Sequence, residues 1–235
     1  TSPPFRADHV GSLLRSPAIT RARAQHARHQ VSTAHLRAIE DDEIEKVIRK
    51  QRDVGLQSAT DGEFRRAWWH FDFFGLLNGV ELREASSGIQ FQGTQTKAQA
   101  PHITGELGFP ANHPMLDHFR FLKAHTGATA KMTIPSPNVL HFRLASVDRS
   151  FYPDREALFG ALAETYRQAV KAFYDVGCRY LQFDDTAWAY LCSKDEVEKA
   201  KQRGTDVDDL AQSYARMINE AIAAQAADMT ITRHV

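Results

Sequence analysis

The chain has 235 residues, of which 43% are hydrophobic and 25% are charged, and its formal net charge is zero. This composition is that of a globular domain, and the balanced charge offers no basic surface to nucleic acid or to an anionic membrane. No stretch approaches the roughly 20 apolar residues that span a bilayer, and no apolar signal-peptide core opens the chain. The two cysteines, Cys178 and Cys192, are expected to be reduced and partly buried, as in a cytoplasmic protein.

Amphipathic helices and short apolar strands alternate along the chain. The predicted helices cover residues 41–53, 115–125, 153–175 and 208–222, and the predicted strands cover residues 5–12, 56–60, 130–134, 178–183 and 229–232. Gly55 and Gly177 follow two of the helices, where a glycine in the left-handed conformation commonly ends a helix. The order of these elements favours a parallel sheet with crossover helices.

The predicted fold is an α/β fold, an incomplete (β/α)8 TIM barrel with about five or six of its eight strands. A single partial barrel domain is expected over residues 1–235, with a loop or hairpin excursion on its rim at about 78–112. A doubly wound open sheet is the competing architecture. It would carry a glycine-rich phosphate loop after the first strand, but Gly11 is the only glycine there.

Polar residues follow the ends of the predicted strands. They are His9 and Ser12, Asp61 and Glu63, Asp184 and Asp185, and His234. Because the carboxyl ends of barrel strands meet at one face, we expect these side chains to gather there. Carboxylates, a hydroxyl group and imidazoles suit a site that holds an amino-acid ammonium, orients a carboxylate and binds a metal.

Each of these residues also has a simpler interpretation. Asp61 before a glycine can form a turn, and Ser12 can cap a helix. Asp184 and its neighbour can begin a solvated loop, and His234 can be an ordinary surface residue. The aromatic run over residues 68–74 can pack in the core or line a pocket for a flat ligand.

Five strand-end motifs together resemble the cobalamin-independent methionine synthase family, in its C-terminal catalytic barrel and above all in its short single-barrel relatives. In chain order they are Arg6-Ala7-Asp8-His9-Val10-Gly11-Ser12, Asp61-Gly62-Glu63-Phe64-Arg65-Arg66, Thr133-Ile134-Pro135-Ser136-Pro137, Gln182-Phe183-Asp184-Asp185 and Met229-Thr230-Ile231-Thr232-Arg233-His234. Each motif is weak alone, but five in the family's order across the whole chain are specific.

The resemblance implies a zinc-dependent methyltransferase that moves a methyl group from a methylated folate-type donor to the thiol of homocysteine, giving methionine. Ser12 would meet the substrate carboxylate, Glu63 and Asp184 would hold its ammonium, and His234 would be the first zinc ligand. The other zinc ligands would follow His234, so the chain is expected to be truncated at its C-terminus. Zinc would make the thiol a thiolate, and His9 is a candidate for the acid that protonates the leaving nitrogen.

Other functions stay open. A barrel of the uroporphyrinogen decarboxylase type would need arginines at the strand ends, and Arg15, Arg65 and Arg66 offer some. A methyltransferase for another thiol is a further alternative, because Asp185-Thr186-Ala187 stands where the family has Glu-Pro-Ala. The third is an inactive partial barrel. The exposed edges of a partial barrel also predict a possible homodimer.

Overall fold

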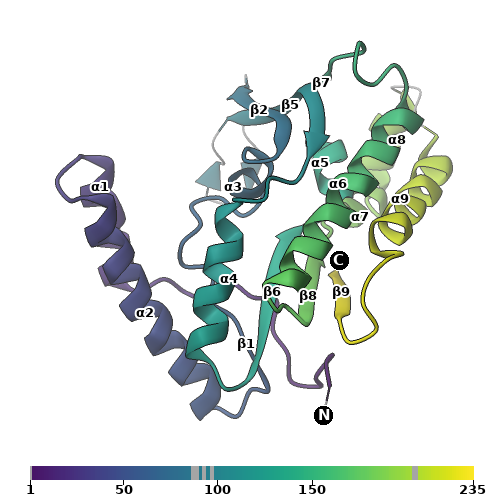
Figure 1. The fold of residues 1–235 in the computed structure, drawn as a ribbon. Coiled ribbons are helices and arrows are strands. Elements are labelled where there is room, and N and C mark those ends of the chain that lie inside the picture. The colour runs from purple at the N-terminus through teal and green to yellow at the C-terminus, as the bar shows by residue number, and fades with distance from the viewer. Residues whose placement is uncertain (1, 86–89, 92–93, 96–97, 203–205) are drawn as a thin grey trace.

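The computed structural model of the chain describes residues 2–85, 90–91, 94–95, 98–202 and 206–235. At its centre lies a four-stranded parallel sheet in the order β1-β6-β8-β9 (Figure 1). The strands are β1 (Ser58–Ala59), β6 (Thr129–Pro135), β8 (Tyr180–Asp184) and β9 (Thr230–His234). Among the described residues this sheet does not close on itself, so the architecture is the incomplete barrel that the sequence predicts, with four parallel strands rather than the expected five or six.

A crossover helix precedes each strand of this sheet. The helices are α2 (Thr33–Asp53), α4 (Pro114–His125), α6 (Arg155–Asp175) and α9 (Val207–Ile222). All four were predicted, although α2 begins eight residues earlier than its apolar stripe indicated, because Ser32 caps it. Gly55 and Gly177 follow α2 and α6 with φ values of +83° and +93°, which confirms their expected role in ending these helices.

The helix α1 (Pro17–Ala27) was not predicted. Ser16 begins it, because the Ser16 hydroxyl accepts a hydrogen bond from the Ile19 amide at 3.3 Å, and Pro17 occupies the first helical position. The Ser-Pro pair was the sequence signal for this helix. Ser12 therefore does not cap a helix, and this simpler interpretation of Ser12 is wrong.

Residues 5–12 do not form the predicted first strand. The segment is extended but joins no strand ladder, and it crosses the face of the sheet opposite the helices. Its main-chain carbonyls accept hydrogen bonds from side chains of the sheet rather than from a neighbouring main chain. The pattern of apolar and polar residues in the sequence cannot distinguish a backbone that hydrogen-bonds to a neighbouring strand from one that hydrogen-bonds to side chains.

A smaller sheet stands beside the parallel one. The strand β2 (Asn78–Glu84) pairs antiparallel with β5 (Gln99–Gly108), which also pairs with β7 (Ser146–Val147). Between β2 and β5 lie the short strands β3 (Gln90–Phe91) and β4 (Thr94–Gln95). The remaining helices are α3 (Phe71–Phe74), α5 (Pro137–Arg143), α7 (Ala187–Leu191) and α8 (Lys194–Gln202).

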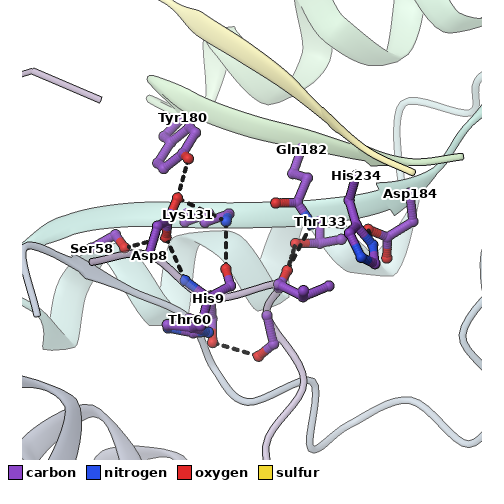
Figure 2. A network of polar contacts seen from close by, with 12 residues as sticks. Asp8, His9, Ser58, Thr60, Lys131, Thr133, Tyr180, Gln182, Asp184 and His234 are labelled. Carbon is purple, nitrogen blue, oxygen red and sulfur yellow. Dashed lines mark hydrogen bonds and ion pairs between the residues drawn. The ribbon is translucent and has the colours of Figure 1, made fainter. Parts of the chain in front are cut away.

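The two faces of β6 and β8 have different chemistry. Met132, Ile134, Leu181 and Phe183 are buried in the hydrophobic core with the helices. The alternate residues of β6 and β8 are mostly polar and point to the other face, toward residues 8–12 (Figure 2). The interior of the open barrel is therefore polar, while the layer between sheet and helices is apolar.

The aromatic run packs mainly in the core. Phe71, Phe73 and Phe74 are buried among other aromatic rings, which settles their role as core packing. Of the cysteines, Cys178 is buried as expected, whereas Cys192 is exposed, so the expectation of burial was wrong for Cys192. Among the described residues, no helix has both the length and the apolar character needed to cross a membrane.

Candidate active site

The ends of β8 and β9 bring Asp184 and His234 together. Their strands pair in parallel with these two residues opposite each other. The Nδ1 of His234 lies 3.3 Å from Oδ1 of Asp184 (Figure 2). Asp184 is buried, whereas the side chain of His234 is 44% exposed. The interpretation of Asp184 and Asp185 as a solvated loop start is wrong, because Asp185 is also buried and accepts hydrogen bonds from Ser136 and Asn138.

The end of β1 contributes Glu63 through a tight turn. The Asp61 carboxylate accepts a hydrogen bond from the Glu63 amide at 2.8 Å, which confirms the turn that the Asp-Gly pair indicates. Glu63 has a φ of +58°, an uncommon conformation for a residue with a side chain. The Arg15 guanidinium donates to the Glu63 carbonyl at 3.0 Å and to the Arg66 carbonyl at 2.7 Å, which holds the turn in place. Strained backbone of this kind often marks a functional position.

The electrostatic surroundings of Glu63 favour its protonation. Burial raises the pKa of this carboxyl to about 7, and the nearby carboxylates of Asp184 and Asp61 add to the effect. An ion pair with Arg66 and the nearby Ser12 hydroxyl act in the opposite direction. Glu63 therefore lies close to both Asp184 and Ser12, and it changes its charge near neutral pH.

Three successive carbonyls of the N-terminal segment are held by side chains of the parallel sheet. The His9 carbonyl accepts from Lys131 at 2.5 Å and the Gly11 carbonyl from Thr60 at 2.7 Å. The Val10 carbonyl accepts from both Thr133 and Gln182, each at 2.9 Å (Figure 2). These contacts fix the main chain that leads into Ser12.

Gly11 has no room for a side chain. A β-carbon at this position would lie 2.8 Å from Oγ1 of Thr133 and 2.9 Å from Oε1 of Glu63, and its φ is +139°. The absence of a side chain lets the N-terminal segment approach the Glu63 carboxylate closely.

A buried ion pair anchors the same segment further from the strand ends. The Nζ of Lys131 lies 3.2 Å from the Asp8 carboxylate, and the Lys131 side chain is 1% exposed. Asp8 also accepts hydrogen bonds from the hydroxyls of Ser58, at 3.0 Å, and Tyr180. These donors keep the pKa of Asp8 below its usual range although burial opposes this.

The structure brings four of the five sequence-predicted site residues together. Ser12 and Asp184 both lie near Glu63, and Asp184 contacts His234. His9 is different, because its Nε2 lies 2.9 Å from the Gln51 side chain of α2 and its ring contacts none of the other four. Its role as an acid stays a prediction that this arrangement does not support.

The sequence assigned no role to the polar residues of the sheet interior, although Thr133 and Gln182 stand in the family motifs. Lys131, Thr133 and Gln182 position the site but do not follow a strand end. Their signal was the period-2 pattern, since polar residues alternate with apolar core residues along β6 and β8. Arg66 stands in one of the family motifs and among the arginines of the decarboxylase alternative, and the structure shows it as the ion-pair partner of Glu63.

The donor set can be compared with what a zinc ion requires. A catalytic zinc site has three protein ligands. Across the described part of the chain, no three His, Cys, Asp or Glu side chains are grouped so that they could hold a metal ion. His234 offers one imidazole with a carboxylate behind it. The described residues do not make a complete zinc site.

A cavity of about 520 Å³ opens at the other end of the sheet. Phe5, Arg52, His125 and Thr129 are among its lining residues. It lies beside the amino ends of β1 and β6, whereas the catalytic face of a barrel is the carboxyl end of its strands. We therefore assign it no substrate.

A parallel α/β barrel sheet with carboxylates, a hydroxyl group and an imidazole at its carboxyl end defines the catalytic domain of a barrel enzyme. Residues 5–235 match the family described as cobalamin-independent synthase, catalytic domain. The chain belongs to this family, as its strand-end motifs indicated.

Individual relatives agree with this assignment. The uncharacterized protein YxjG of Bacillus subtilis is 48% identical over 99% of this chain. A solved structure, the putative vitamin-B12 independent methionine synthase from Listeria monocytogenes, is 42% identical and covers the whole chain with a TM-score of 0.84. The 5-methyltetrahydropteroyltriglutamate–homocysteine methyltransferase of Thermosynechococcus vestitus is 28% identical over 80% of this chain.

These relatives are longer than the chain. The match spans 62% of YxjG, 66% of the Listeria protein and 24% of the Thermosynechococcus methyltransferase. The activity of the longer proteins can therefore only be proposed for this chain.

Proposed function

We propose that this chain binds homocysteine as part of a methyltransferase that transfers a methyl group from a methylated folate-type donor to the homocysteine thiol, giving methionine. One observation carries the proposal: Ser12, Glu63, Asp184 and His234 come from four separate segments and meet at one end of the sheet. An α-amino acid presents an ammonium and a carboxylate on the same carbon. Two carboxylates beside a hydroxyl group are complementary to that pair.

Each residue has a distinct role in the proposal. Glu63 and Asp184 receive the ammonium, and Ser12 donates to the substrate carboxylate. In the reaction the sulfur–carbon bond forms as the carbon–nitrogen bond of the donor breaks, and the departing nitrogen takes up a proton. We assign no residue to that proton transfer.

The names of the relatives support this proposal. The Thermosynechococcus protein is named for methyl transfer from 5-methyltetrahydropteroyltriglutamate to homocysteine. Zinc with His234 as a ligand, a methylated folate as co-substrate, a homodimer, a cytoplasmic location and a single domain over residues 1–235 stay predictions.

The arginines near the site are engaged in other contacts, which disfavours the decarboxylase alternative. Arg15 donates to two carbonyls of the Glu63 turn, and Arg66 pairs with Glu63 itself. Arg65 pairs with Asp41 at 2.5 Å. Arginines that hold a loop in this way are poorly placed to receive the propionates of a porphyrin.

The proposal is tested by calorimetric titration of the chain with L-homocysteine. Glu63→Gln and Asp184→Asn should each weaken binding at least about tenfold, because a hydrogen bond to a charged group contributes roughly 1.5–3 kcal/mol. Glu81→Gln, an exposed carboxylate on β2, is the matched control and should bind like the wild type. A wild-type chain that binds no homocysteine at millimolar concentration would overturn the proposal, as would site variants that bind like the control.

A further inference from the structure

The side chain of Gln182 joins the two halves of the candidate amino-acid site. Gln182 is buried in the middle of β8, on the inner face of the sheet. Its Nε2 donates to the Val10 carbonyl and to Oδ1 of Asp184, both at 2.9 Å. Figure 2 shows it between the N-terminal segment and Asp184.

The orientation of this amide follows from its partners. A carbonyl and a carboxylate are both acceptors, so the nitrogen of the amide must face them and its oxygen cannot. Rotation of the amide by 180° would break both hydrogen bonds and bring oxygen against oxygen. The two acceptors therefore fix the side chain, and the side chain in turn fixes their separation.

The two contacts belong to different parts of the site. Val10 lies two residues before Ser12, which the proposed function assigns to the substrate carboxylate. Asp184 is assigned to the substrate ammonium. Thr133 also donates to the Val10 carbonyl at 2.9 Å but has no contact with Asp184. Gln182 is thus the residue through which the N-terminal segment and Asp184 are joined.

We infer that Gln182 is a positioning residue that sets the distance between the ammonium-binding and carboxylate-binding groups, and so selects α-amino acids as the substrate class. This inference rests on the proposed function. Gln182 acts through Asp184, because the side chains of Gln182 and His234 both contact Oδ1 of Asp184. The other carboxylate oxygen, for which the described residues show no partner, remains available to the substrate.

The inference is tested with Gln182→Met and the matched control Thr133→Val. Both variants remove a hydrogen bond to the Val10 carbonyl, but only the first removes the bond to Asp184. The probes are L-methionine and 3-(methylthio)propanoate, which is methionine without its ammonium group. Calorimetry measures the affinity of each variant for each probe, and thermal melting reports stability.

In the wild type, L-methionine should bind more tightly than the analogue. Gln182→Met should reduce that preference at least fivefold, whereas Thr133→Val should leave it unchanged even if both variants melt at lower temperature. A structural role alone would weaken the binding of both probes equally and leave their ratio intact.

The outcomes separate the two proposals. If the wild type binds L-methionine and Gln182→Met keeps the wild-type preference, the inference about Gln182 is overturned while the proposed function stands. If the wild type binds neither L-methionine nor L-homocysteine, the proposed function is overturned, and the inference with it.

Discussion

The carboxylate of Asp184 lies 3.3 Å from the Nδ1 of His234, although 50 positions separate the two residues. The parallel register of β8 and β9 places them opposite each other, so the sheet itself creates the contact. Gln182 contacts the same carboxylate oxygen from within β8. Asp184 is therefore held from two sides before any substrate binds, and such preorganisation lowers the free energy cost of binding.

Replacing Glu63 by Gln should change the pH dependence of stability. The pKa of Glu63 is raised from 4.5 to about 7 in the folded protein, so the folded state holds a proton that the unfolded state loses between these values. The contribution of Glu63 to the free energy of unfolding of the wild type is therefore largest below pH 4.5 and decreases as the pH rises to 7. The uncharged variant lacks this loss, so its stability relative to the wild type should increase by about 3 kcal/mol between pH 4 and 8. Urea unfolding at both pH values measures this, and a constant difference would contradict it.

Replacing His70 by Phe should make the protein more resistant to acid. His70 is 2% exposed, its ring nitrogens have no hydrogen-bond partner among the described residues, and burial lowers its pKa to about 3. The folded state keeps this ring neutral, so stability is full above pH 6.5 and falls as the pH drops from 6.5 toward 3. At pH 5 the loss is roughly 2 kcal/mol, and the variant should avoid it.

Urea unfolding at pH 7.5 and pH 5 tests the His70 prediction. His35→Phe, at an exposed position of α2, serves as the control for an added phenylalanine. A variant of His70 that loses as much stability on acidification as the wild type would show that this histidine does not drive the effect.

Adding a methyl group at Gly11 should damage both stability and amino-acid binding. The new β-carbon of Gly11→Ala would press on Thr133 and on the Glu63 carboxylate at a φ that disfavours side chains. We expect a loss of roughly 1–3 kcal/mol in the free energy of unfolding. Gly127→Ala, where the β-carbon would meet nothing within 4 Å, is the control and should be nearly neutral. Equal effects from the two substitutions would refute the close packing around Gly11.

Replacing Asp8 and replacing Lys131 should lower the free energy of unfolding by different amounts, although the two residues form one ion pair. Lys131→Met leaves Asp8 with the hydroxyls of Ser58 and Tyr180, whereas Asp8→Asn removes the nearest counter-charge of a buried ammonium and leaves it with neutral acceptors such as the His9 carbonyl. Removing one partner of a buried pair costs roughly 3–5 kcal/mol when the remaining charge is uncompensated. We expect Asp8→Asn to approach that range and Lys131→Met to stay below it, as measured by chemical denaturation. The opposite order would mean that the more distant carboxylates of Asp184 and Glu63 compensate the charge of Lys131.

The strand-end motifs were a good guide to the candidate site because topology links them in a general way. Parallel strands place their carboxyl ends at one edge, so Glu63, Asp184 and His234 were expected to meet before their distances were known. The crossover helices were equally readable, since apolar stripes and terminal glycines are local signals. The first strand was the main failure, because an extended segment looks the same whether its backbone pairs with a strand or with side chains.

The sequence by itself determined the alternation of helices and strands, the family and the set of residues at the strand ends. These depend on local periodicity and on motifs that a linear chain displays directly. Only the tertiary structure decided that residues 8–12 cross the inside of the sheet, that His9 turns toward Gln51 and that Gln182 joins Val10 to Asp184. The reason is that such contacts depend on side chains from distant strands meeting in three dimensions, and no local pattern records which donor reaches which acceptor.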